Sequence, residues 1–322
     1  MHFAFKFFAI CFLISVSTLS FSWQVLFNSP PDAGNLKKSL VDLIDSAHMS
    51  IHIAIYSVDD EDIIAILKKK IDENVDVRIV MEGENYLKSL KHLYPLDVVA
   101  DPPTNGLMHS KYVIVDGRYV WCGSSNFTKS SFYKDFNNAV IFDSYELANV
   151  FENDFQRMRN GFFSSKENEQ TNFLVEGIKV EVRFSPSKDS FDLILDKLKR
   201  AKSEIDVAIY SFSDPRIGLF LAYLDQKGVK VRVIADEEWN SSSYSFIPKM
   251  KEFDFVKKYK VIDGLLHDKY VIIDPNGSDP VVITGSYNLT LSAERKNSEV
   301  VLFIYSKEIA LEYLKNFNSI FN

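Results

Sequence analysis

The chain has 322 residues, of which 46% are hydrophobic and 25% are charged, and this composition excludes a disordered or collagen-like protein. At about 100–200 residues per domain, the length predicts two domains. Lysine and arginine number 37 against 44 aspartates and glutamates, so the formal net charge is −7. This acidity argues against a protein that follows nucleic acid along a broad basic face.

The first 22 residues are expected to be a signal peptide. Lys6 lies in a short n-region, residues 7–16 form an apolar run, and Ser22 is a small residue suited to cleavage before Trp23. The alternative is an uncleaved N-terminal membrane anchor. Either form predicts that the rest of the chain works outside the cytoplasm, as a secreted, periplasmic or anchored protein.

Removal of this segment changes both the charge and the cysteine count. Lys6 leaves without any acidic residue, so the balance becomes 36 − 44 = −8. Cys11 leaves as well, and Cys122 then stands alone without a possible intrachain disulfide. We expect Cys122 to be a buried apolar residue, with a reactive thiol as the alternative.

The remaining chain contains the same unit twice. Four segments of the first half recur in the same order in the second half: 51–57 and 205–211, 75–80 and 229–234, 109–116 and 267–274, and 123–126 and 285–288. A repeat of this length indicates a duplicated domain rather than a solenoid. We predict a first domain over residues 23–163, a linker over 164–172 and a second domain over 173–322.

Each copy alternates between helix and strand in chain order. In the first copy the pattern predicts a helix over 36–44, a strand over 51–56, a helix over 63–71 and a strand over 75–81. The last third of each copy is strand-rich and is expected to form hairpins. The predicted fold is therefore two duplicated α/β domains, each with a mixed, mostly parallel sheet flanked by helices.

A histidine and a lysine occur at equivalent positions in the two copies. His109 and Lys111 in the first copy, like His267 and Lys269 in the second, are two residues apart and project from one face of a strand. A nucleophile or acid and an oxyanion-binding cation then point at one volume. A Gly-Ser-x-Asn turn follows in each copy, and its side chains are candidate phosphate ligands: Ser124, Asn126, Ser286 and Asn288.

The spacing His-x-Lys-(x)4-Asp-(x)6-Gly-Ser-x-Asn resembles the motif of the phospholipase D superfamily. The first copy fits it without gaps, whereas the second carries a longer segment, 275–284, before its glycine. The resemblance implies that the copies pack with pseudo-twofold symmetry around one shared active site. It also implies a phosphodiesterase that works through a phosphohistidine, without a metal ion or cofactor.

The resemblance also suggests roles for the other polar residues of the motifs. Glu299 matches an acid that orients an imidazole in family members, and Asn137 is its equivalent in the first copy. With the carboxylate assigned to His267, we expect His109 to be the nucleophile and His267 the general acid.

The motif aspartates complete the catalytic set but are expected to act indirectly. Asp116 and Asp274 have the opposite strand parity to the histidines, so we expect them to anchor the site turns through backbone N–H groups.

The substrate is less clearly indicated than the chemistry. Net acidity favours a secreted phosphoric diester hydrolase of the phospholipase D type, which converts a phospholipid to phosphatidic acid and an alcohol. The alternative is a nonspecific endonuclease, whose DNA or RNA backbone would be held by basic residues past the motifs: Lys129, Lys134, Arg295 and Lys296. A noncatalytic binding module is a third, more remote interpretation.

Aromatic residues are expected at the rim of the site. They lie in the loop 236–246 and, in the first copy, at Tyr86 and Tyr94, where they could stack on bases or enter a membrane interface. We expect peripheral membrane contact, no obligate protein partner and a monomer, because both motifs lie in one chain.

Overall fold

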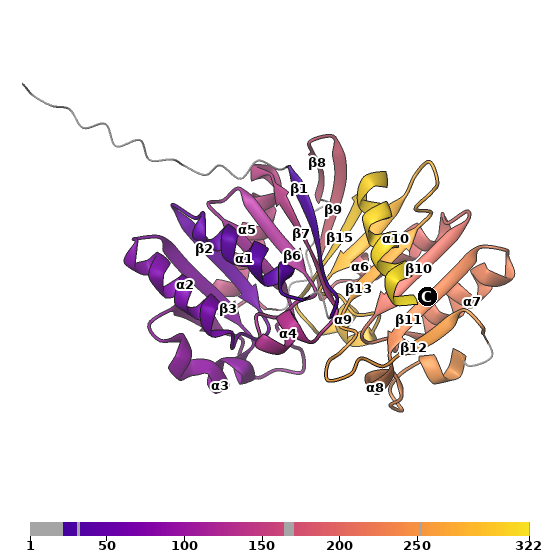
Figure 1. The fold of residues 1–322 in the computed structure, drawn as a ribbon, viewed down its shortest axis with the longest axis horizontal. Helices are drawn as coiled ribbons and strands as arrows, with labels where there is room; N and C mark the ends of the chain where they lie inside the picture. Colours follow the sequence, from indigo (N-terminus) through magenta and orange to yellow (C-terminus); the bar gives the residue numbers. More distant parts are fainter. Residues whose placement is uncertain (1–21, 31–32, 164–170, 251–252, 322) are drawn as a thin grey trace, which may run out of the picture.

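The computed structural model describes residues 22–30, 33–163, 171–250 and 253–321 (Figure 1). The predicted signal peptide falls almost wholly outside these ranges. Most of the predicted linker, 164–170, also lies outside them, so the domain boundaries stay a prediction. Within the described residues, no helix combines the length and the apolar character that a bilayer crossing requires.

The first copy is built around a seven-stranded sheet in the order β1-β7-β6-β5-β2-β3-β4. Its strands are β1 (Trp23–Asn28), β2 (Ser50–Ile55), β3 (Asp76–Met81), β4 (Asp97–Ala100), β5 (Lys111–Val115), β6 (Tyr119–Gly123) and β7 (Asn137–Asp143).

The second copy has an eight-stranded sheet in the order β12-β11-β10-β13-β14-β15-β9-β8. Its strands are β8 (Thr171–Val175), β9 (Ile178–Ser185), β10 (Glu204–Ile209), β11 (Lys230–Asp236), β12 (Val256–Tyr259), β13 (Lys269–Ile273), β14 (Val281–Gly285) and β15 (Glu299–Tyr305).

The two sheets confirm the duplicated α/β fold but correct one detail of it. Parallel pairing joins β2 to β3 and β3 to β4, and the equivalent strands of the second copy, while the other described neighbours in both sheets are antiparallel. The expectation of mostly parallel sheets is therefore wrong. The physical reason is that no long helix separates β5, β6 and β7, and short connections favour antiparallel neighbours.

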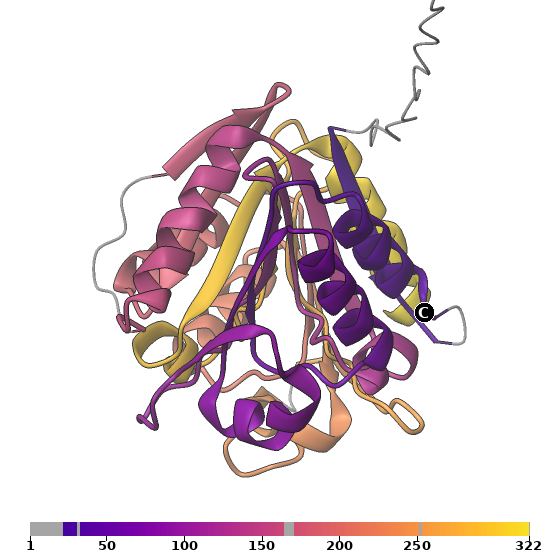
Figure 2. The same ribbon diagram turned by 90° about the vertical axis from the view of Figure 1, so that its left-hand side faces the viewer.

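The helices cover the outer faces of the two sheets and the flanks of the space between them (Figures 1 and 2). They are α1 (Asn35–Asp45), α2 (Glu61–Asp72), α3 (Gly83–Leu93), α4 (Lys129–Tyr133), α5 (Tyr145–Arg159), α6 (Lys188–Lys199), α7 (Pro215–Gln226), α8 (Glu237–Asn240), α9 (Leu291–Arg295), α10 (Lys307–Phe321) and the 3-10 helix Ile247–Met250. Local sequence fixes their ends: Asp60, for example, accepts hydrogen bonds from the first-turn amides of α2.

Three buried clusters hold these layers together. One packs the first sheet against α1 and α2, and a second packs the second sheet against α6 and α7. The third draws on both copies, including Tyr112 and Val140 of the first sheet, Tyr270 and Val282 of the second, and Tyr313 of α10. The two sheets therefore share one apolar core and form a single body.

Reciprocal backbone contacts join the copies at one end of this body. Met108 forms a parallel bridge with Ser298, and Leu266 forms the equivalent bridge with Phe136. A glycine lies two residues before each of the bridging residues Met108 and Leu266. A Cβ on Gly106 would lie 2.0 Å from the carbonyl oxygen of Lys296, and a Cβ on Gly264 2.1 Å from that of Lys134, so both close approaches require glycine.

A candidate active site shared by the two copies

The two histidine-lysine pairs lie where strands of equivalent position begin. Lys111 opens β5 and pairs with Ile55, the last residue of β2, and Lys269 likewise pairs with Ile209 at the end of β10. The backbone N–H of His109 donates to the carbonyl of Ser298, and that of His267 donates to the carbonyl of Phe136, both at 2.9 Å. Each histidine is thus held by the other copy.

Each imidazole is also oriented by a side chain from the opposite copy. His109 Nδ1 lies 2.8 Å from Glu299 Oε2, and His267 Nδ1 lies 2.9 Å from Asn137 Oδ1. Both partners accept at these atoms, so Nδ1 carries the hydrogen in each ring and Nε2 is the nitrogen available to a substrate.

This crossed pairing corrects the sequence-based assignment of Glu299 to His267. The bridge between Met108 and Ser298 brings the next residue, Glu299, beside His109. The bridge between Leu266 and Phe136 does the same for Asn137 and His267. The premise on which the nucleophile was first assigned is therefore wrong, although the two orienting residues themselves are the expected ones.

The motif serines hold the orienting residues. Ser286 Oγ donates to Glu299 at 2.6 Å, and Ser124 Oγ donates to Asn137 Oδ1 at 2.9 Å. Both serines are fully buried. Their hydroxyls therefore bind the orienting side chains. The prediction from the sequence that these hydroxyls bind a phosphate is corrected.

The motif asparagines are half-buried and keep polar groups near the site. Asn288 Oδ1 accepts from the backbone N–H of Ser211 at 3.2 Å, which leaves its amide NH₂ as the group suited to a phosphate oxygen. The Oδ1 atom of Asn126 is buried without a hydrogen-bond partner among the described residues.

The two lysines are buried in matching environments. Lys111 Nζ donates to the carbonyl oxygen of His109 and Lys269 Nζ to that of His267, both at 2.7 Å. Burial lowers the pKa of Lys111 to about 7 and that of Lys269 well below its usual value. An anionic phosphate between them would favour their charged forms.

Burial has the same effect on the histidines. Desolvation lowers the pKa of His109, against the opposing charge of Glu299, and lowers the pKa of His267 further still. The charges of Lys269, Lys111 and His109 contribute to the depressed pKa of His267, so the two motifs interact electrostatically across the copies.

Two tyrosines complete the site and were not singled out from the sequence. The rings of Tyr56 and His109 are centred 5.0 Å apart, as are those of Tyr210 and His267. Each tyrosine ring also lies beneath the lysine Nζ of its own copy, at 5.1 and 5.3 Å from the ring centroid. The signal was present, since both tyrosines belong to the recurring segments 51–57 and 205–211.

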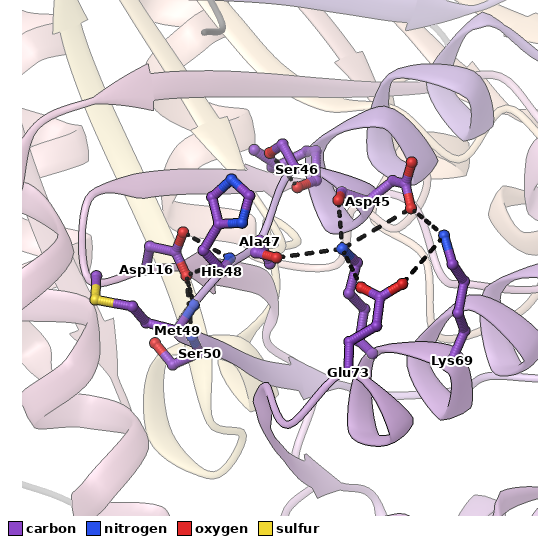
Figure 3. Close-up of polar contacts among 11 residues, drawn as sticks. Asp45, Ser46, Ala47, His48, Met49, Ser50, Lys69, Glu73 and Asp116 are labelled. Carbon is purple, nitrogen blue, oxygen red and sulfur yellow. Dashed lines mark hydrogen bonds and ion pairs between the residues drawn. The ribbon is translucent and has the colours of Figure 1, made fainter. Parts of the chain in front are cut away.

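The motif aspartates directly follow the other end of their strands, β5 and β13. Figure 3 shows Asp116. The carboxylate of Asp116 accepts from the backbone N–H groups of His48, Met49 and Ser50 at 2.7–3.2 Å. Asp274 binds the equivalent amides of residues 202–204 and the hydroxyl of Ser203. As expected, they bind backbone N–H groups. The turns that they anchor, however, precede β2 and β10 and are not the turns of the site. Their place in the catalytic set is therefore corrected.

The expected aromatic rim and basic cluster are present only in part. The ring centroids of Trp239, in α8, and Tyr210 are 6.2 Å apart, which places an aromatic side chain of the loop 236–246 next to the site. Lys134 forms an ion pair with Asp263 at 2.6 Å and is thereby partly neutralised as a phosphate ligand. Cys122 is buried, as predicted.

Metal-ligating side chains do not converge in the part of the chain that the structure describes: no three histidine, cysteine, aspartate or glutamate residues are grouped so as to hold an ion. The absence of a metal or cofactor from the chemistry stays a prediction.

Comparison with known proteins gives the same two regions. The family model described as cardiolipin synthase, PLD-like domain, matches residues 40–159 and again residues 194–321. A phospholipase D of Rickettsia prowazekii is 28% identical over 60% of this chain and 84% of its own length. The mitochondrial cardiolipin hydrolase of Mus musculus is 31% identical over 42% of this chain and 59% of its own.

Among solved structures, the phosphatidylserine synthase of Haemophilus influenzae Rd KW20 has the same fold. It superimposes with a TM-score of 0.73 over 93% of this chain and 86% of its own, at 16% identity.

Proposed function

Because the chain belongs to the phospholipase D superfamily and is thus a phosphodiesterase of that type, we propose that it hydrolyses a phospholipid to phosphatidic acid and an alcohol through a phosphohistidine. The observation that carries this proposal is the pair of buried imidazoles, each with Nδ1 fixed by the opposite copy. We further propose that the enzyme acts outside the cytoplasm, on the basis of its N-terminal 22 residues.

The bound anionic phosphate favours the imidazolium form of His267, whose pKa is lowered by burial in the free protein. In the first step His109 Nε2 attacks phosphorus while the imidazolium of His267 gives its Nε2 proton to the leaving oxygen. The N–P bond forms, the P–O bond breaks and the alcohol departs. Water then attacks the phosphohistidine, His267 takes one proton from it, and the N–P bond breaks to release the phosphomonoester. The two histidines end as they began, and no metal ion or cofactor enters this scheme.

The unlike orienting groups support this division of roles. Phosphorylation places positive charge on the ring of the nucleophile, and the Glu299 carboxylate at His109 compensates it. The acid must give up its proton, and the neutral Asn137 amide orients His267 without holding that proton by charge. The assignment made from the sequence thus stands as a proposal, but on the opposite pairing.

The buried lysines and the motif asparagines are proposed to bind the non-bridging oxygens. Lys111 and Lys269 approach the site from both copies, and the amide of Asn288 lies on the same turn as Ser286. Their charges and donors would stabilise the negative charge on the phosphoryl group as its bonds rearrange.

A phospholipid substrate is favoured over nucleic acid by three observations. The chain is acidic, one of its basic residues past the motifs is paired with Asp263, and the relatives named above are a phospholipase D and a cardiolipin hydrolase. An endonuclease activity remains the alternative proposal. A monomer is expected, since both histidine-lysine pairs lie in one chain.

The test is to offer the purified chain phosphatidylcholine, cardiolipin and single-stranded DNA in parallel, with EDTA present. Release of phosphatidic acid, together with an acid-labile, histidine-linked phosphate in a sample denatured without acid, supports the proposal. His109→Ala should abolish hydrolysis. Cleavage of DNA without lipid hydrolysis would favour the endonuclease, and full activity of His109→Ala would overturn the shared-site mechanism.

A further inference from the structure

Helix α3 presents an apolar stripe to solvent. Of its side chains only Leu93 is buried, while Leu87 is 71% exposed and Leu90 is 43% exposed. Tyr94, which follows the helix, is 78% exposed. These three residues are three and four positions apart, so they lie along one side of the helix. A helix of a globular protein normally buries such a stripe.

The equivalent region of the second copy also exposes large apolar side chains. Tyr244, after α8, is 83% exposed, and Ile262, between β12 and β13, is 91% exposed. Figures 1 and 2 place α3 and α8 at the same lower end of the molecule. We call Leu87, Leu90, Tyr94, Tyr244 and Ile262 the rim surface.

The rim surface is tied to the strand ends that carry the histidines. Glu82, which precedes α3, accepts from the backbone N–H of Met108 at 2.7 Å, and Met108 adjoins His109. Asp236, which precedes α8, accepts from the N–H of Leu266 at 3.0 Å, and Leu266 adjoins His267. The apolar elements therefore start beside the catalytic residues of both copies.

Lysines accompany the apolar side chains. Lys88 and Lys91 lie on α3 between and beside the two leucines, and neither forms an ion pair within the described residues. Lys258 and Lys260 are exposed near Ile262. On α3 the two lysines accompany one glutamate, Glu84, and the segment 256–263 carries three lysines and one aspartate, whereas α8 carries Glu237 and Glu238. Positive charge therefore exceeds negative charge on α3 and on the segment 256–263, in a chain whose net charge is −7. Apolar side chains flanked by lysines are typical of a surface that lies in the interface of an anionic bilayer.

We propose that the rim surface docks on an anionic phospholipid bilayer and thereby presents lipid headgroups to the histidine pair. This inference rests on the proposed function and names the form in which the substrate is met: a lipid within a membrane and not a dispersed one. Three of the five side chains are aliphatic and offer nothing for bases to stack on, so the surface as a whole fits nucleic acid less well.

The experiment measures sedimentation of the full chain with vesicles of phosphatidylcholine and phosphatidylglycerol, in the His109→Ala background so that the lipids stay intact. The test variant is Leu87→Ser/Leu90→Ser. The matched control is Leu219→Ser/Leu311→Ser, which removes two exposed leucines, 63% and 39% accessible, from α7 and α10. We expect the vesicle affinity of the test variant to fall at least about tenfold and that of the control to stay unchanged.

A second measurement separates this proposal from the proposed function. With His109 restored, the rate on vesicles is divided by the rate on the soluble diester bis(p-nitrophenyl) phosphate. The ratio should fall about tenfold in the test variant and stay constant in the control. If the parent fails to hydrolyse the soluble diester, this result counts against the proposed function alone, because vesicle binding is measured without turnover.

Three results would overturn the docking proposal. The parent chain does not sediment with vesicles, or the test variant sediments as the parent does. The third is a dimer of the parent chain that does not bind vesicles and that the two leucine substitutions dissociate, as measured by light scattering. The apolar stripe would then be covered by a second copy of the chain.

Discussion

Replacement of Glu299 by glutamine tests the division of labour between the two histidines. The carboxylate is fully buried, accepts from Ser286 at 2.6 Å, and lies 2.8 Å from His109 Nδ1. Glutamine keeps the shape and one acceptor oxygen but removes the charge. A hydrogen bond to a charged group is worth about 1.5–3 kcal/mol, so the loss predicts a rate about 10- to 150-fold lower.

The assay compares two leaving groups on the same phosphoryl group. A p-nitrophenolate leaves without help from an acid, whereas an alkoxide needs a proton. If His109 is the nucleophile, Glu299→Gln slows release of both leaving groups, because the charge on the phosphohistidine loses its partner in either case. Pre-steady-state release of p-nitrophenol measures this step directly.

Asn137→Asp provides the reciprocal change at His267. A carboxylate there raises the pKa of the acid and makes its proton harder to release, so the alkyl ester should be affected much more than the p-nitrophenyl ester. The reasoning is refuted if the pattern is exchanged, with Glu299→Gln slowing only the alkyl ester, because His109 would then be the proton donor.

Three further predictions concern residues outside the histidine pairs. Asp116→Asn should lower the free energy of unfolding by about 2–3 kcal/mol, because its hydrogen bonds to three backbone N–H groups are weakened. The kcat of the folded protein should stay unchanged. Loss of kcat with intact folding would return Asp116 to the catalytic set. Gly106→Ala should lower the free energy of unfolding by about 1–3 kcal/mol and remove most of the activity, because the new methyl group meets the carbonyl oxygen of Lys296. The control Asn105→Ala, on the same exposed loop, should change neither quantity. If the two variants behave alike in urea unfolding and in turnover, the contact is contradicted. Asp101→Asn should stabilise the protein by about 1–3 kcal/mol at pH 7, because burial raises the pKa of this carboxyl to about 6 and its ionised form therefore disfavours folding. This cost begins above the unfolded-state pKa of about 4 and is complete above about pH 6. In urea titrations the gain should therefore vanish below about pH 4.

The repeat allowed much of the site to be predicted. His109 and His267 were singled out because they recur with their lysines and asparagines, and the resemblance to the phospholipase D superfamily implied that the two motifs converge. Tyr56 and Tyr210 carried the same signal and could have been included. The mixed α/β class followed from periodicity, but strand direction did not, because alternating hydrophobicity does not distinguish a hairpin from a crossover.

The partner of each imidazole could not be predicted in the same way. Glu299 was paired with His267 because both lie in the second copy, whereas strand parity shows only which side of a sheet a residue occupies. The observed partner is decided by the bridge between Met108 and Ser298, which joins segments 190 residues apart. The buried serines were misassigned for a different reason: their partners lie in their own copy, at the first residue of a strand that begins 13 residues later.

The crossed pairing has a consequence for how such a protein can evolve. Two identical chains that assembled in this way would have to place the same residue beside both rings, so their histidines would have equal proton affinity and interchangeable roles. Fusion of the copies into one gene removes that constraint. The glutamate at one ring and the asparagine at the other are a difference that two identical chains could not carry.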